Sequence, residues 1–169
     1  MGMRLAIDNV TIFWMQLLLS CVVCGIVAKW YVWPSLTNLS RNSALIPLIF
    51  VHVFRYVGMT VLVTGMVDPK LPREVLAATA YGDLLAAALA LASVFALRSN
   101  WRVAIPLVWV FNTWGFVDLL NALRSVLQTN LPSFNLGAVW FIYTFYAPVV
   151  IATHLMIFVV LIKSKSWKK

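Results

Sequence analysis

Ionisable side chains interrupt a sequence that is otherwise apolar. His52 and Arg55 lie in one long apolar stretch, and Asp83, Asp118 and His154 each lie in another. If these stretches cross a membrane, inserting an arginine at the bilayer centre costs roughly 2.5–3.5 kcal/mol. Such an arginine is therefore expected to pair with an acidic residue or to have a function. We therefore expect these residues to pair with one another and to mark a functional site.

Depth along the helices indicates the pairing. At about 1.5 Å per helical residue, Arg55 lies near the middle of its stretch, and Asp83 and Asp118 lie roughly 4–6 Å further toward one side. An arginine side chain spans that offset, so we expect Arg55 to pair with Asp83, Asp118 or both. If both carboxylates are ionised, the cluster is net negative and attracts a cation or a proton. The structural alternative is a buried ion pair that only fixes helix packing.

Polar and aromatic residues accompany the charged ones at helical spacing. Arg55 and Tyr56 follow His52 by three and four residues, which places them on one side of a helix, and Trp114 and Asn121 share a side with Asp118. Tyr143 and Tyr146 share a face of the last apolar stretch. Such faces could enclose a ligand cavity. The predicted ligand-binding residues are Arg55, Asp83, Asp118, Tyr56, Trp114, Asn121, Tyr143 and Tyr146.

The two histidines form a second pattern. His52 and His154 each lie about 12 Å from the same side of their stretches, counted along a helix. Equal depth on two helices is what two axial ligands of one haem b require. Two separately hydrogen-bonded histidines are the alternative, with no cofactor. We expect no other metal site, because no third soft ligand lies at that level.

The composition predicts the elements that must position these residues. Of 169 residues, 63% are hydrophobic and 11% are charged, with a mean hydropathy of +0.92. A soluble domain carries about a quarter charged residues. Runs longer than about 20 apolar residues cross a bilayer as helices, whose backbone groups are satisfied internally. The sequence therefore predicts an all-α, polytopic integral membrane protein with five transmembrane helices in one bundle, at 10–33, 44–66, 76–97, 103–127 and 137–162.

The connections and the charges predict the organisation. The connections are too short for a soluble domain, so residues 1–169 form a single transmembrane domain with a basic tail at 163–169. Five spans put the termini on opposite sides. The side of the C-terminus carries Lys29, Arg41, Arg98, Arg102, Lys163, Lys165, Lys168 and Lys169, whereas the other carries Arg4, Lys70, Arg73 and Arg124. The positive-inside rule then predicts an outside N-terminus and a cytoplasmic C-terminus. This rule also accounts for the net charge of +8, so we expect no nucleic-acid partner.

The leading functional prediction is a membrane protein that binds or translocates a small ion or a compact organic ligand at an intramembrane polar site. We expect a homo-oligomer, because a second copy could complete the cavity of so small a bundle. The first alternative is a haem b electron-transfer protein that uses His52 and His154. The second is an intramembrane enzyme that uses Asp83 and Asp118 as acid and base on a lipid-soluble substrate. Enzymatic activity is the less favoured expectation.

Overall fold

The computed structural model describes residues 7–163, which fold into helices with no strand among them. The first long helix, Asn9–Thr37, consists of α1 (Asn9–Val27), the π-helical turn η1 (Ala28–Val32) and α2 (Trp33–Thr37). The second consists of α3 (Arg41–Val53) and the 3₁₀ helix η2 (Phe54–Leu62). Next come α4 (Arg73–Arg98), α5 (Ala104–Thr129) and the short η3 (Leu131–Ser133). The last long helix consists of α6 (Val139–Phe141), the π-helical turn η4 (Ile142–Tyr146) and α7 (Ala147–Ile162).

The prediction of an all-α chain is confirmed for the described residues. Four helices are long and apolar enough to cross a membrane: Asn9–Thr37, Arg41–Leu62, Arg73–Arg98 and Val139–Ile162. They correspond to four of the five predicted spans. The span predicted at 103–127 is α5, which is as long as α4, with 26 residues, but is not among these four helices. Of the predicted basic tail, Lys163 is described, and the rest lies outside the described residues, as does Arg4.

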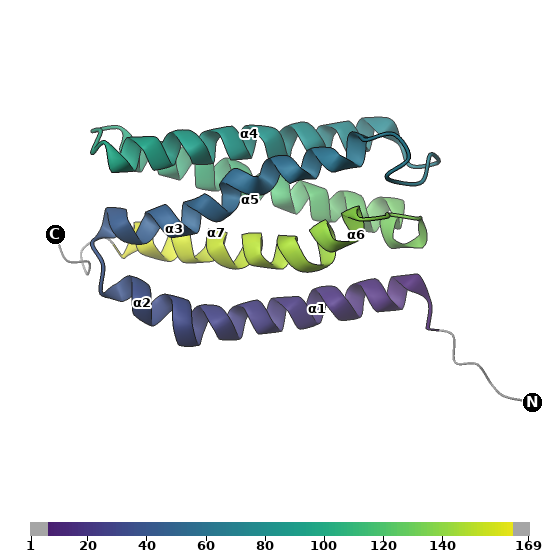
Figure 1. Cartoon of the computed structure of the whole chain (residues 1–169), viewed down its shortest axis with the longest axis horizontal. Coiled ribbons are helices and arrows are strands. Elements are labelled where there is room, and N and C mark those ends of the chain that lie inside the picture. The colour runs from purple at the N-terminus through teal and green to yellow at the C-terminus, as the bar shows by residue number, and fades with distance from the viewer. Residues whose placement is uncertain (1–6, 164–169) are drawn as a thin grey trace, which may run out of the picture.

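The long helices run side by side in alternating directions, so the start of α1 and the end of α7 lie at opposite ends (Figure 1). α1 lies along α7 and η4, at one side of the other helices. The buried residue of α1 is Phe13, whose ring packs edge-on against Trp140 at a centroid distance of 5.3 Å. The indole N–H of Trp140 also donates to Gln16 Oε1 at 2.6 Å. Further along α1, the side chains of Leu18, Leu19, Val22 and Val23 are exposed.

A proline follows each π-helical turn. Pro34 is near the start of α2, directly after η1, and Pro148 is near the start of α7, directly after η4. A proline inside an α-helix clashes with the carbonyl four residues earlier and donates no hydrogen bond to it. The wider π turn relieves this clash, because it changes the pairing of that carbonyl. Both long helices therefore continue through their prolines instead of ending there.

The change from α to 3₁₀ geometry at Phe54 decides which residues of the second long helix face inward. The buried residues of η2 are Arg55, Gly58 and Val61, which recur every third residue as in a 3₁₀ helix. Tyr56 is 49% exposed. The prediction that Tyr56 faces the same interior as Arg55 is therefore wrong, because it assumed α-helical spacing. A 3₁₀ run of nine residues is unusually long, and such runs often mark functional segments.

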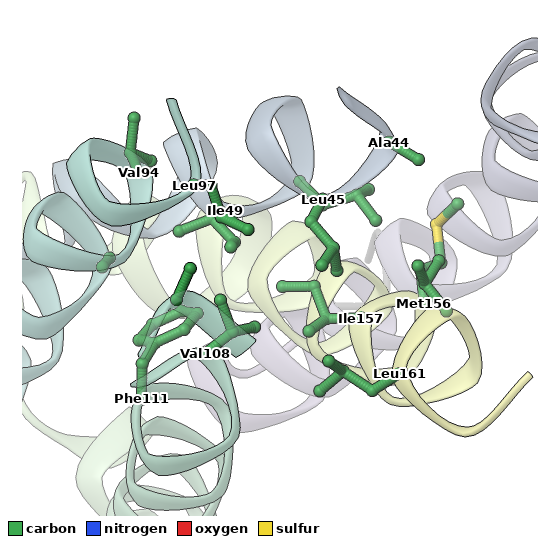
Figure 2. Packing of buried hydrophobic residues seen from close by; sticks show 14 of the residues in the cluster. Ala44, Leu45, Ile49, Val94, Leu97, Val108, Phe111, Met156, Ile157 and Leu161 are labelled. Carbon is green, nitrogen blue, oxygen red and sulfur yellow. The ribbon is translucent and has the colours of Figure 1, made fainter. Parts of the chain in front are cut away.

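The core has two apolar clusters, one toward each end of the bundle. One joins α3, α4, α5 and α7, whose side chains converge in Figure 2. The other joins α1, η2, α4, α5, η3 and α6. Buried polar residues lie between the two clusters: His52, Arg55, Asn112, Thr153 and His154. The helices thus place one polar layer inside an apolar interior.

Candidate functional site

Arg55 is the centre of the polar layer. Its side chain is 2% exposed, and its Nε donates to Asp83 Oδ1 at 2.8 Å. Its Nη2 donates to Asp118 Oδ2 at 2.6 Å and lies 2.8 Å from Asp83 Oδ1. Its Nη1 donates to the carbonyl oxygen of Gly115 at 2.9 Å. The prediction that Arg55 pairs with Asp83, Asp118 or both is confirmed, since it pairs with both. We call these three residues the ion cluster.

His154 extends the ion cluster away from the aspartates. Its Nε2 lies 3.3 Å from Arg55 Nη1, and its Nδ1 lies 2.8 Å from Asn112 Oδ1. The Asn112 amide is oriented by its nitrogen, which donates to the carbonyl oxygen of His154 at 3.3 Å. Because Asn112 Oδ1 only accepts, Nδ1 of His154 carries the proton, and Nε2 accepts from the guanidinium. This hydrogen-bond geometry assigns His154 as a neutral imidazole.

His52 lies against His154 but has different partners. The two ring centroids are 4.1 Å apart, and both side chains are fully buried. Nε2 of His52 is 3.0 Å from Thr153 Oγ1, whereas Nδ1 has no hydrogen-bond partner in the described structure. The predicted equal depth of the histidines is confirmed. However, two axial ligands lie on opposite sides of a porphyrin, and rings in direct contact leave no room for one between them.

Three glycines allow polar side chains to pack directly against the backbone of a neighbouring helix. A Cβ atom added at Gly58 would overlap Asp83 Oδ2, and one added at Gly82 would overlap Asp118 Oδ1. At Gly115 it would lie 2.9 Å from Cε1 of His154. Each of η2, α4 and α5 therefore has a glycine where a carboxylate or imidazole group packs against its backbone. These glycines were not predicted as site residues, because their role depends on neighbours distant in sequence.

We expect Gly58→Ala and Gly82→Ala to destabilise the protein by about 1–3 kcal/mol each, as overpacking does. The carboxylate facing the new methyl group can move only by weakening its contact with Arg55. Gly25→Ala is the matched control, because a Cβ there has nothing within 4 Å, and alanine is the better helix former. Thermal unfolding in detergent compares the three variants. Equal stability of all three would contradict the close approach of the carboxylates to these glycines.

A cavity of about 310 Å³ adjoins the ion cluster. Arg55, Asp83, Tyr143 and Tyr146 line it, and apolar side chains of α1, α5 and α7 form most of the remaining wall. Asp118 is paired with Arg55 but is not part of this lining.

The cavity reaches the side of the bundle. Leu120 and Leu123 of α5 line it, and both side chains are exposed. Trp114 is 45% exposed, and Asn121 is also exposed; neither lines the cavity. The expectation that Trp114 and Asn121 face the same interior is wrong, because the buried face of α5 runs through Phe111, Asn112 and Gly115 instead.

The fold and the site define an all-helical protein with helices apolar enough for a membrane and an arginine–aspartate cluster at their centre. The chain belongs to the DUF8737 family, a domain of unknown function, which matches residues 12–162. No curated protein and no solved structure matches the chain. Membership of this family indicates no activity.

Proposed function

We propose that the protein is an integral membrane protein with five spans, an outside N-terminus and a cytoplasmic C-terminus. Four apolar helices support this proposal, and α5 is as long as α4 and packs against it. The polar groups that lower the hydropathy of α5 include Asn112 and Asp118, which bond to other helices. Intramembrane polar residues are expected to be satisfied in this way.

Cysteine labelling tests the fifth span. In a Cys21→Ser, Cys24→Ser background, we expect an impermeant thiol reagent to label Ser133→Cys in intact cells, but not Arg102→Cys until the membrane is permeabilised. The two exposed positions lie beyond opposite ends of α5, so they are on opposite sides of the membrane only if α5 crosses it. Labelling of both positions in intact cells would contradict a fifth span. Labelling of Arg102→Cys alone would contradict the orientation.

We infer that this membrane protein binds a compact, largely apolar organic ligand in the cavity beside the ion cluster. The observation that supports this function best is the contact of Arg55 and Asp83 with an apolar cavity of about 310 Å³. Ligand sites are typically apolar pockets of about 300–1,000 Å³ with a few oriented polar groups. Ion pairs that only hold helices together have no need of an adjoining cavity.

The lateral extent of the cavity supports a lipid-soluble ligand, because such a ligand could enter from the bilayer between α1 and α5. Asp83 and Asp118 contact the same guanidinium, whereas an acid and a base require different environments. Binding is therefore favoured over intramembrane catalysis. The homo-oligomer stays a prediction.

A cavity-filling variant tests the ligand site. We expect wild-type protein to bind phenylbutanol, a compact neutral probe, and Ala122→Phe to weaken this binding by at least about tenfold, because the new ring occupies the cavity that Ala122 lines. Ala88→Phe is the control, since Ala88 is exposed on α4. Equilibrium dialysis in detergent measures the affinity. No saturable binding to the wild type, or equal binding to both variants, would contradict the site.

A further inference from the structure

The hydrogen-bonding capacity of Arg55 is fully used inside the protein. Its Nε–H and one N–H of Nη2 face Asp83 Oδ1, and the other N–H of Nη2 faces Asp118 Oδ2. The two N–H groups of Nη1 face the Gly115 carbonyl and His154 Nε2. A guanidinium has five N–H donors, and all five have acceptors here. Arg55 therefore has no donor left for a carboxylate or phosphate group of a ligand.

Asp83, in contrast, keeps a free acceptor. Its Oδ1 takes both contacts from Arg55, and its Oδ2 accepts no hydrogen bond from the described residues. Oδ2 lies against Gly58, which lines the cavity together with Asp83. The hydroxyl of Tyr143, which also lines the cavity, has no hydrogen-bond partner among residues 7–163. Asp83 and Tyr143 thus give the largely apolar lining of the cavity an anionic acceptor and a phenol.

The charge of the ion cluster indicates what these two residues can bind. One guanidinium and two carboxylates sum to −1 when all three are ionised. An uncompensated charge in a low-dielectric interior is costly, so a cation beside Asp83 would be stabilised. The rings of Tyr143 and Tyr146 line the same cavity, and aromatic faces attract organic cations.

We propose that the ligand of this cavity is a free organic cation, an apolar molecule with a protonated amine that pairs with Asp83 Oδ2. This inference rests on the proposed ligand site and specifies its chemistry. The amine donates to Oδ2, and the apolar remainder fills the cavity toward Leu120 and Leu123. A cavity of about 310 Å³ is at the small end of ligand sites, so the cation is compact rather than a lipid with two acyl chains.

Three probes with a similar apolar body and different head groups test the proposal: phenylbutylamine, phenylbutanol and phenylbutyrate. We expect the amine to bind wild-type protein at least about tenfold more tightly than the alcohol, and the carboxylate most weakly. An alcohol that binds as tightly as the amine would overturn the cation proposal and leave the ligand site standing. Tighter binding of the carboxylate would also overturn it. If none of the three binds, the proposed ligand site itself fails.

The variant Asp83→Asn tests whether Asp83 is the group that binds the amine. It removes the charge but keeps an oxygen for Arg55, so we expect amine affinity to fall at least about tenfold, and alcohol affinity to fall much less. Retained alcohol binding shows that the cavity is intact. Glu74→Gln is the matched control, because it removes the same charge from an exposed position of α4 and should change neither affinity. Tyr143→Phe keeps the cavity intact and should weaken amine binding selectively, which keeps the proposal testable if Asp83→Asn does not fold.

Two further results would overturn the proposal. Unchanged amine affinity in Asp83→Asn would show that Asp83 is not the partner of the cation. Displacement of the amine by short-chain phosphatidylethanolamine at matched concentration would assign the site to a lipid head group instead of a free amine. We expect neither result when the protein is held in phosphatidylcholine nanodiscs.

Discussion

Arg55→Met should destabilise the protein by about 3–5 kcal/mol, the usual cost of removing one partner of a buried ion pair. The substitution leaves Asp83 and Asp118 close together without a cation, and leaves Gly115 and His154 without their donor. Thermal or denaturant unfolding in detergent measures the loss. Arg124→Met is the control, because Arg124 is exposed on α5 and its replacement should change stability by no more than about 0.5 kcal/mol.

The triple variant Arg55→Met, Asp83→Asn, Asp118→Asn should recover most of that stability. Neutral or apolar replacement of a whole buried ion cluster is often tolerated, because no charge is left unpaired. If Arg55→Met is as stable as the wild type, the two ion pairs do not hold the helices together. If the triple variant is no more stable than Arg55→Met, the loss does not come from unpaired charge.

His154→Leu should cost about 2–4 kcal/mol, whereas His52→Leu should cost less than about 1.5 kcal/mol. The two histidines are equally buried and lie in contact, and leucine is close to histidine in volume. Loss of His154, however, leaves buried Asn112 Oδ1 without a donor and one N–H of Arg55 Nη1 without an acceptor, while the other N–H still donates to the Gly115 carbonyl. Loss of His52 takes a hydrogen bond only from Thr153, whose hydroxyl also hydrogen-bonds to the carbonyl oxygen of Val149.

The difference between these two variants separates a histidine that holds the ion cluster from one that packs beside it. Unfolding midpoints measured under identical detergent conditions provide the comparison. Equal losses would contradict the hydrogen-bond chain from Asn112 through His154 to Arg55. A larger loss for His52→Leu would show that its unpartnered Nδ1 has a partner in solution.

The sequence predicted the helices and the ion pairs because both depend on simple geometry. Apolar runs of sufficient length predict helices, and counting residues along them placed Arg55, Asp83 and Asp118 within reach of one another. The same count placed His52 and His154 at one level, where the structure has their rings in contact.

The inward faces of the helices were harder to predict. In a protein that is apolar on all sides, the residues facing the core and those facing outward are similar, so periodicity does not separate them. Trp114 and Asn121 were therefore assigned to the wrong face of α5. Tyr56 was misassigned because η2 has 3₁₀ geometry, and its Arg55–Gly58 spacing of three was the available signal. Asn112 was missed because its role depends on an orientation that no spacing rule provides.

The most direct test of the central claim, that the ion cluster is part of a ligand site, is the affinity of the triple variant Arg55→Met, Asp83→Asn, Asp118→Asn for phenylbutylamine. This variant should fold stably, so that lost binding cannot be attributed to unfolding. We predict that it binds the amine at least about tenfold more weakly than the wild type. A stable triple variant with wild-type affinity would contradict the account and would leave the cluster with a purely structural role.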